Sequence, residues 1–346
     1  MKRYIKYIIT ALLLISVLCF LTFLLKPKYV SEVTEGRLIA EYYQEEMNHD
    51  VLFVGDCEVY ENFVPEILWN EYGINSYIRG SAQQLIWQSY YLLEDALRYE
   101  KPKVVIFNVL SMKYDEPQKE AYNRMSIEGM RWSKSKIDCI NASMTPSEKF
   151  LDYVFPILRY HSRITELTSE DFTHINDQLV RFHNGYYMRV DVRPAENVPE
   201  GQILGNYQFG DNSYKYLDML TKLCKEEGIE LILIKAPSLY PYWYPEWEEQ
   251  MVEYAKANNL KYINFLDLQD EVGLDWNEDT YDAGLHLNLF GGEKVTRYLG
   301  DYLITECGLA DRRGEEHLDS IWKAKNVAFE ADKQDKLSKL ELADGQ

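Results

Sequence analysis

The chain has 346 residues and a formal net charge of −19, from 56 acidic and 37 basic side chains. Phosphate binding requires clustered Lys and Arg, so this balance argues against DNA or RNA as a partner and against adsorption to an anionic membrane face. Five widely spaced cysteines without a C-x-x-C pair form neither a disulfide framework nor a zinc site.

An apolar segment opens the chain. Residues 7–25 carry no charge, and this length matches the roughly 20 residues that a helix needs to cross a membrane. Three basic residues within the first six positions predict a cytoplasmic amino end and an outward-facing remainder. Because no small-x-small cleavage site follows Leu25, we expect an uncleaved anchor. We interpret residues 1–28 as a cytoplasmic stub and transmembrane anchor, and residues 29–49 as a polar linker.

Short apolar runs then alternate with helical patterns. Strands are expected at about 50–54, 75–79, 103–109, 230–235 and 261–265. Helices are expected at about 65–72, 83–99, 212–227, 246–258 and 289–307. Strands alternating with helices predict a five-stranded parallel sheet with helices on both faces, an α/β domain over residues 50–310.

Two stretches depart from this alternation. Residues 115–206 are rich in Met, Tyr, Arg and His and contain helical patches, so we interpret them as an insertion. It is either a cap on the functional site or a solvent-facing helical embellishment. Residues 311–346 form a charged tail with scattered apolar positions, which we expect to be frayed or disordered.

The stretch around Cys57 is the strongest candidate for chemistry. Gly55 and Asp56 break the first strand and place Cys57 at its carboxyl end, where open α/β sheets bind ligands. A cysteine nucleophile needs a base, and the base needs an acceptor that fixes its tautomer. His286 and Asp282, ahead of the last helix, are the only close His–Asp pair that this fold places on the same rim. The alternative is a structural cysteine buried in an ordinary turn.

These blocks resemble those of the SGNH/GDSL hydrolase superfamily: Gly-Asp-Cys57 after the first strand, Gly80 after the second, and Asp-then-His before the last helix. The resemblance covers roughly residues 50–115 and 210–307. It is closest to the membrane-anchored, outward-facing branch, which includes the D-alanine-transfer protein of teichoic acid modification and alginate-type O-acetyltransferases. It implies a flavodoxin-like three-layer α/β/α fold and ester hydrolysis or acyl transfer through a covalent acyl-enzyme. It also implies an oxyanion held by backbone N–H groups near Cys57 and Gly80.

The sequence departs from the family pattern in three ways. Cys57 replaces serine, and thiolate is a better leaving group than alkoxide, which favours passing an acyl group onward. Asp282 lies four residues before His286 instead of three, so Asp279 is an alternative partner for the ring. The third-block G-x-N-D is absent, which leaves Asn108 as the candidate for a side-chain oxyanion donor.

Other polar and aromatic residues fall on the same rim. Lys235, at the end of the fourth strand, could bind an anionic group or snorkel to solvent. Tyr242 and Trp243 could stack on sugar rings or pack their loop against the insertion. The sequence contains no Gly-rich phosphate loop, no H-E-x-x-H motif and no metal-spaced carboxylates, so we expect no cofactor and no metal.

The sequence therefore predicts a membrane-anchored SGNH-like esterase or O-acyltransferase that acts outside the cytoplasm on an acylated cell-envelope glycan. A membrane-bound acyltransferase is an expected partner. The second hypothesis is a catalytically inactive binding or accessory protein of an envelope-modification complex. The third is a thiol enzyme whose base comes from the insertion: His161, His174 or His183.

Overall fold

A computed structural model describes residues 2–26, 36–173 and 183–344 of the chain. Its centre is a sheet of five strands: β1 (Val51–Gly55), β2 (Ser76–Gly80), β3 (Val104–Asn108), β4 (Glu230–Lys235) and β5 (Lys261–Asn264). The strand order is β2-β1-β3-β4-β5, and every neighbouring pair is parallel. The predicted α/β class and five-stranded parallel sheet are confirmed.

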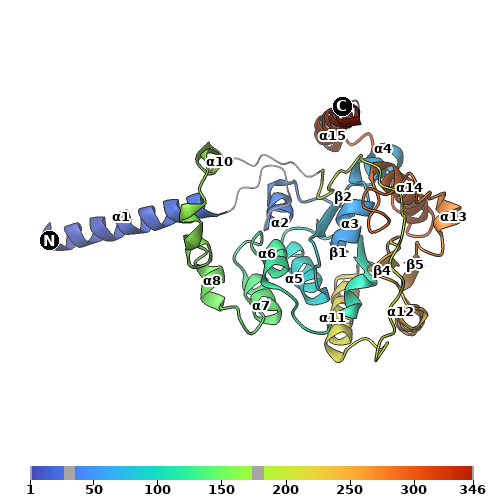
Figure 1. Cartoon of the computed structure of the whole chain (residues 1–346), viewed down its shortest axis with the longest axis horizontal. Helices are drawn as coiled ribbons and strands as arrows, with labels where there is room; N and C mark the ends of the chain where they lie inside the picture. The colour runs from blue at the N-terminus through green and yellow to red at the C-terminus, as the bar shows by residue number, and fades with distance from the viewer. Residues whose placement is uncertain (1, 27–35, 174–182, 345–346) are drawn as a thin grey trace.

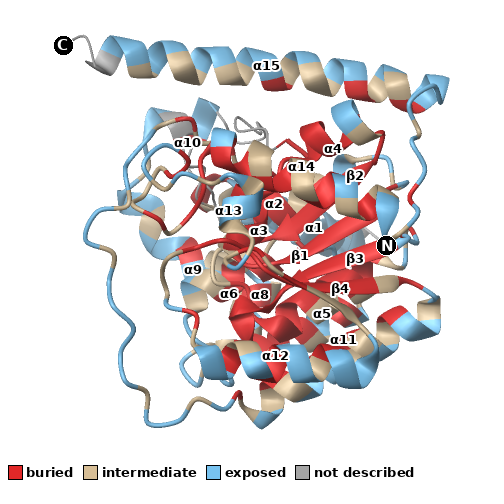
Figure 2. Cartoon of the chain, turned by 90° about the vertical axis from the view of Figure 1, so that its right-hand side faces the viewer, coloured by how far each residue is buried: buried red, intermediate tan, exposed pale blue. Residues whose placement is uncertain are grey.

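Helices cover both faces of the sheet (Figure 1). One face packs against α3 (Cys57–Asn62), α4 (Pro65–Tyr72) and α14 (Leu289–Thr305). The other packs against α5 (Ile86–Ala96), α11 (Asp211–Glu227) and α12 (Pro245–Asn258). Along β1, Val51 and Phe53 enter the first core and Leu52 and Val54 the second, as strand alternation requires. With both faces covered, the first four strands are almost wholly buried (Figure 2).

The predicted insertion has a helical and an extended part. Its helical part comprises α6 (Glu120–Ile127), α7 (Lys134–Ser143), α8 (Phe150–Val154), α9 (Ile157–Tyr160), η3 (His161–Thr165) and α10 (Ser169–Thr173). A separate apolar cluster joins α6, α7 and α8 to α5, so these helices extend the α5 side of the domain. The extended part, residues 183–196, crosses the other side and hydrogen-bonds to Tyr60, Thr280 and Leu289. This extended part therefore borders the loop that contains the predicted site residues Asp282 and His286.

The expectation of a frayed tail is wrong for its described part, which forms the helix α15 (Glu316–Asp344) across the top of the domain in Figure 2. Leu318, Trp322 and Phe329 lie on one helix face and are buried. The Trp322 ring stacks on Trp69 of α4, with centroids 5.4 Å apart and planes 6° apart. A few large apolar side chains at helical spacing therefore dock a segment whose charged composition suggested disorder.

The N-terminal helix α1 (Lys2–Leu25) projects from the domain (Figure 1). Within its residues 3–25, an 18-residue window has a mean hydropathy of 2.9 and is mostly exposed. Among the described residues, α1 is the one helix long and apolar enough to span a membrane. In the predicted linker, residues 29–35 lie outside the described residues. The remainder forms α2 (Arg37–Glu41) and η1 (Tyr42–Gln44), whose buried Leu38 and Tyr42 belong to the domain core.

Candidate active site

The turn after β1 places Cys57 at the first residue of α3. The Asp56 side chain caps this helix by accepting a hydrogen bond from the Glu58 backbone N–H at 3.2 Å. Gly80, at the end of β2, lies so close to α3 that a Cβ atom there would be 2.8 Å from Val59 Cγ2. A glycine at this position therefore lets the helix bearing the thiol approach the sheet.

His286 and Asp282 lie in one tightly folded loop before α14. The Asp282 carboxylate accepts two hydrogen bonds from His286, from Nδ1 at 2.7 Å and from the backbone N–H at 2.8 Å. The four-residue spacing permits this because the loop turns back on itself: Thr280 Oγ1 donates to the His286 carbonyl at 2.8 Å. Asp279 is committed elsewhere, to Lys294 at 2.7 Å. The structure thus pairs His286 with Asp282 and not with Asp279.

The Cys57 thiol and the His286 ring lie near enough that the charge of each shifts the pKa of the other. Asp282 occupies Nδ1 of the ring. Nε2 is buried and has no hydrogen-bond partner among the described residues, so it is the nitrogen available to the thiol. Burial raises the pKa of Cys57, and the nearby imidazole offsets only part of that rise. Burial alone would lower the pKa of His286, but Glu61, Cys57 and Asp282 together raise it well above its ordinary value. These three groups therefore keep the ring protonated up to a higher pH than in a free imidazole.

Glu61 is a second carboxylate at the His286 ring, and the sequence analysis missed it. Its Oε2 lies 3.6 Å from Nδ1, and its carboxylate accepts a hydrogen bond from the Tyr281 hydroxyl. The Tyr281 ring stacks on the imidazole at a centroid distance of 6.0 Å and an interplanar angle of 14°. Burial raises the pKa of Glu61, and the His286 charge opposes this. Glu61 lies four residues after Cys57 and shares its face of α3, but this short helix was not among the predicted ones, so the spacing gave no signal beforehand.

Asn62, the last residue of α3, ties the surrounding loops together. Its Oδ1 accepts a hydrogen bond from the Leu287 backbone N–H at 2.9 Å. Its Nδ2 donates to the Pro237 carbonyl, in the loop after β4, at 3.0 Å. The same helix therefore carries Cys57 at one end and holds the His286 loop at the other.

A buried polar network lies beneath the nucleophile turn. Glu58 is fully buried and accepts hydrogen bonds from Lys235 Nζ at 2.9 Å, Asn108 Nδ2 at 2.8 Å and Ser238 Oγ at 2.5 Å. Asn108 Nδ2 also donates to Asp56 Oδ1 at 2.9 Å. Burial, followed by the charge of Glu58, raises the pKa of Asp56 to about 6. Most groups of this network lie at the ends of β1, β3 and β4. Their hydrogen bonds to one another make the turn after β1 rigid.

This network corrects the roles expected of Asn108 and Lys235. Both Nδ2 hydrogens of Asn108 are used by Asp56 and Glu58, so its amide is not free to bind an oxyanion. Lys235 is fully buried and neutralises Glu58 instead of facing an anionic substrate. The sequence did not indicate this because nothing in it showed that Glu58 turns into the sheet.

The two aromatic candidates, Tyr242 and Trp243, have different environments in the structure. Trp243 is buried, donates from Nε1 to Glu248 at 2.7 Å and packs on Trp247, so it holds the loop together. Tyr242 is 44% exposed and lines a surface groove of about 500 Å³. The groove also includes residues 198–203 and Leu239, whose backbone N–H donates to the Gly284 carbonyl at 2.7 Å. The groove therefore adjoins the loop that carries Asp282 and His286.

The insertion histidines do not form an alternative pair with Cys57 in the described residues. His161 is exposed and its Nδ1 lies 2.8 Å from the Leu158 carbonyl. His183 lies between Glu66, at 3.6 Å, and Asp332, at 3.0 Å. His174 lies outside the described residues.

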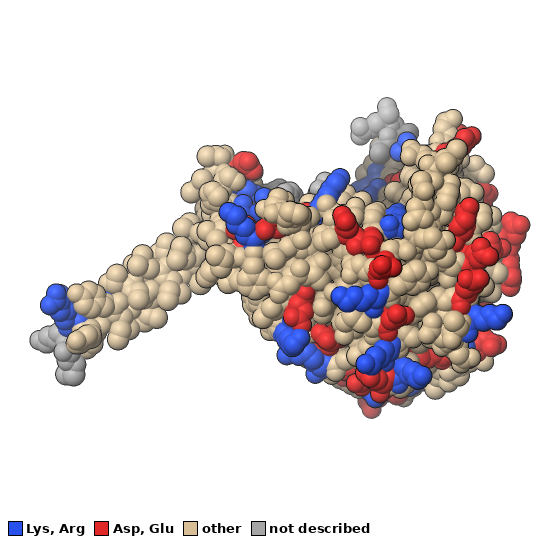
Figure 3. Space-filling view, turned by 90° about the horizontal axis from the view of Figure 1, so that it is seen from below, with Lys and Arg blue, Asp and Glu red and all other residues tan. Residues whose placement is uncertain are grey.

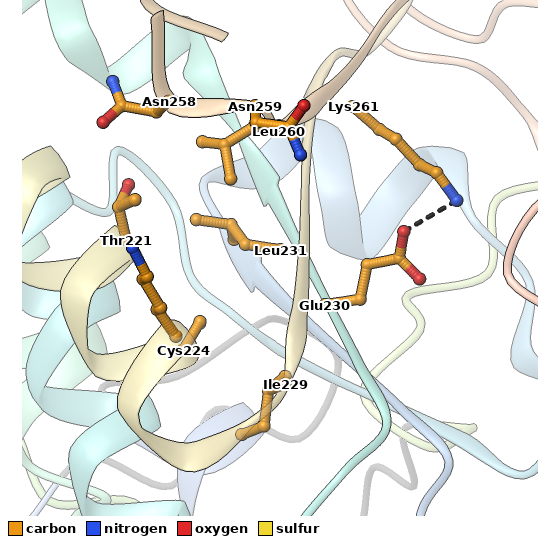
Figure 4. A pocket seen from close by; sticks show the side chains of 10 residues that line it. Thr221, Cys224, Ile229, Glu230, Leu231, Asn258, Asn259, Leu260 and Lys261 are labelled. Carbon is orange, nitrogen blue, oxygen red and sulfur yellow. Dashed lines mark ion pairs between the residues drawn. The ribbon is translucent and has the colours of Figure 1, made fainter.

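A second depression, of about 530 Å³, lies at the amino ends of β4 and β5 (Figure 4). Glu230 and Lys261 form an ion pair of 2.7 Å at its edge, and Cys224 lies in its wall. Burial raises the pKa of Cys224 to about 12, and no histidine is among the ten lining residues. The lining residues of this depression therefore include no Cys–His pair like the one on the opposite rim.

A five-stranded parallel sheet with Cys57, His286 and Asp282 at its carboxyl edge defines an α/β protein. The chain is similar to three solved structures, each with a TM-score of 0.37. One is described as an acylhydrolase from Bacteroides fragilis (12% identity, 76% of this chain and 93% of that one). Another is a G-D-S-L family lipolytic protein from Desulfitobacterium hafniense (15%, 73% and 99%). A third is a GDSL-like lipase from Bacteroides thetaiotaomicron (12%, 80% and 100%).

No family model and no curated protein matches the chain. Two of the three structural descriptions name the GDSL family, which is the superfamily that the sequence motifs resemble. None of them names a membrane-anchored branch.

Proposed function

We propose that the chain is an ester hydrolase or acyltransferase that uses Cys57 as its nucleophile, His286 as acid and base, and Asp282 to orient His286. The observation that carries this proposal is the hydrogen-bonded Asp282–His286 pair beside the thiol at the carboxyl edge of the sheet. A nucleophile, a base in contact with it and a carboxylate that fixes the base form the constellation used for acyl transfer on several unrelated folds.

The reaction begins when Cys57 transfers its proton to Nε2 of the neutral form of His286. The thiolate attacks the ester carbonyl carbon, a C–S bond forms, and the tetrahedral intermediate expels the alcohol, which takes the proton from His286. Water or an acceptor hydroxyl then gives its proton to His286, attacks the thioester and releases the thiol. Because Asn108 is committed to the buried network, the backbone N–H groups at Cys57 and Gly80 are the oxyanion donors in this proposal.

We further propose that α1 anchors the protein in a membrane with the domain outside the cytoplasm, where it acts on an ester of a cell-envelope glycan. The length and hydropathy of α1 support anchoring, and the basic residues at its start support the orientation. The groove beside the His286 loop, with the partly exposed Tyr242 ring on its wall, suits stacking against a sugar.

The test is acylation of the full-length protein in detergent micelles by p-nitrophenyl acetate, followed by intact-mass measurement and peptide mapping. We expect one acetyl group on Cys57, none in Cys57→Ala, and a slower reaction in His286→Ala. Cys307, which is also partly exposed, serves as an internal control for non-specific acetylation. A folded protein whose Cys57 is alkylated by iodoacetamide but never acetylated would contradict the proposal.

A catalytically inactive accessory protein is the second candidate. Two observations favour it: burial raises the pKa of the Cys57 thiol, and the Asn108 amide is not free for an oxyanion. If Cys57→Ala keeps the cellular phenotype while Tyr242→Ala abolishes it, the second candidate replaces the first.

A further inference from the structure

The segment of residues 150–173, which contains α8, α9, η3 and α10, carries a dense group of exposed large apolar side chains. These residues and their exposed fractions are Leu151 (57%), Phe155 (54%), Leu158 (48%), Ile164 (60%) and Phe172 (56%). Soluble surfaces scatter such side chains singly, whereas a cluster of them marks an interaction surface.

The inner side of the same segment is firmly packed on the domain. Tyr153 and Tyr160 are buried, and the Arg124 guanidinium lies 4.2 Å from the centroid of the Tyr153 ring. Arg124 is itself held by Glu120 of α6 at 2.9 Å. The segment is therefore amphipathic, with one side built into the domain and an apolar side left uncovered.

The uncovered side lies at the base of α1. Helix α1 contacts α9, η3 and α10, and in Figure 1 these elements cross the end of α1 transversely. Arg163 of η3 donates to the Leu25 carbonyl, the last residue of α1, at 2.7 Å, and also pairs with Asp171 at 3.1 Å. Figure 3 shows the surface of α1 free of charged side chains between its basic tip and the domain. The apolar surface of α1 is therefore continuous with the segment.

The length of α1 determines how deep in a membrane the exposed apolar side of residues 150–173 would lie. Residues 3–25 rise by about 35 Å as a helix, slightly more than the roughly 30 Å hydrocarbon core of a bilayer. If α1 spans the membrane, Leu25 lies at the far interface, and so does the segment bonded to it. A helical surface with an apolar side lies in that interface with its side chains buried about 5–10 Å into the headgroup and acyl boundary.

We infer that residues 150–173 form a lipid-contacting surface that rests in the membrane interface around α1 and fixes how the domain stands on the bilayer. The inference rests on the anchoring proposed above. The occupant is lipid because the surface is continuous with the membrane-spanning helix and lies at the interfacial level that the length of α1 sets.

The test uses the full chain in liposomes of phosphatidylcholine and phosphatidylglycerol, prepared with and without bromine on the upper acyl chain. Leu158→Trp adds a fluorophore at the surface, and Val252→Trp, on α12 with a matching exposure of 46%, is the control. We expect the emission that Leu158→Trp adds over the native protein to be lost in brominated liposomes and that of Val252→Trp to be retained. Equal emission of Leu158→Trp in both liposomes would overturn the inference.

Two further measurements separate the possible failures. Alkaline carbonate extraction reports on the anchor: a chain released by carbonate contradicts the proposed anchoring, whereas a retained but unquenched chain contradicts only the lipid-contacting surface. A photoreactive p-benzoylphenylalanine at the position of Phe155, in native membranes, reports the occupant. Adducts with lipid support the inference, and adducts with a protein would assign this surface to a membrane-protein partner instead.

Discussion

Replacing Glu61 by Gln tests how the protonation of His286 is set. Glu61 Oε2 lies 3.6 Å from His286 Nδ1. At this distance, Coulomb's law with an effective dielectric constant of about 20 gives about 5 kcal/mol between unit charges. Burial raises the pKa of Glu61, and Asp282 also stabilises the charged ring. The interaction free energy lost in Glu61→Gln is therefore smaller than this value. We expect Glu61→Gln to destabilise the protonated ring by about 1.4–2.7 kcal/mol, which is a ten- to hundredfold change in its protonation equilibrium.

The assay is hydrogen–deuterium exchange at the His286 C2 position, followed by mass spectrometry across pH, because it reports ring protonation without requiring activity. The pKa of His286 is raised in the native protein, so its neutral, proton-accepting form appears at a higher pH than in a free imidazole. Glu61→Gln should let the ring deprotonate at lower pH, and the rising limb of esterase activity should move with it. Tyr281→Phe, which removes the hydroxyl donor to Glu61, should give a smaller shift in the same direction. An exchange profile in Glu61→Gln that overlays the native one would refute this account.

Three further changes test the structure around the site. Asp282→Asn removes the carboxylate that orients the imidazole, so turnover in an ester assay should fall by about 10³–10⁴ while the urea midpoint is kept; undiminished turnover would exclude its role. Lys235→Met strands the buried Glu58 charge and should lower the free energy of unfolding by about 3–5 kcal/mol in urea. Adding Glu58→Gln should recover most of that loss, and an equally unstable double variant would contradict the pairing. Trp322→Ala removes the stack on Trp69 and should cost about 3–5 kcal/mol, with early proteolysis of α15; a native cleavage rate would show that the stack does not hold the helix.

The central sheet was predictable because its strands are short apolar runs bounded by Gly, Pro and polar residues. The expected strand at 75–79 is β2 at Ser76–Gly80, and the expected helix at 65–72 is α4 at Pro65–Tyr72. The docking of α15 was not predictable from composition, because a few widely spaced side chains such as Trp322 hold it and their partners lie far away in sequence. Local pattern therefore specified the sheet, while long-range packing decided the tail.

The position of the site follows from a general property of parallel sheets, whose carboxyl ends share one edge. That property is enough to bring Cys57 and His286 together from distant parts of the chain. It does not say which polar side chains on that edge face a ligand and which pair with one another. Glu58 takes Lys235 and Asn108 into the interior, and Glu61 joins His286, because a six-residue helix turns each carboxylate in a direction that its sequence alone does not reveal.

The hydrogen bonds of Asn62 have a consequence for how the protein can diverge. Helix α3 sets the distance between the thiol and the imidazole. Cys57 is its first residue, and its last residue, Asn62, hydrogen-bonds to the His286 loop about one and a half turns later. Lengthening or shortening that helix by one residue would rotate the two ends by about 100° relative to each other. The insertion and α15 can therefore change in length or composition during evolution without moving the two groups apart, whereas an insertion or deletion within residues 57–62 would separate them.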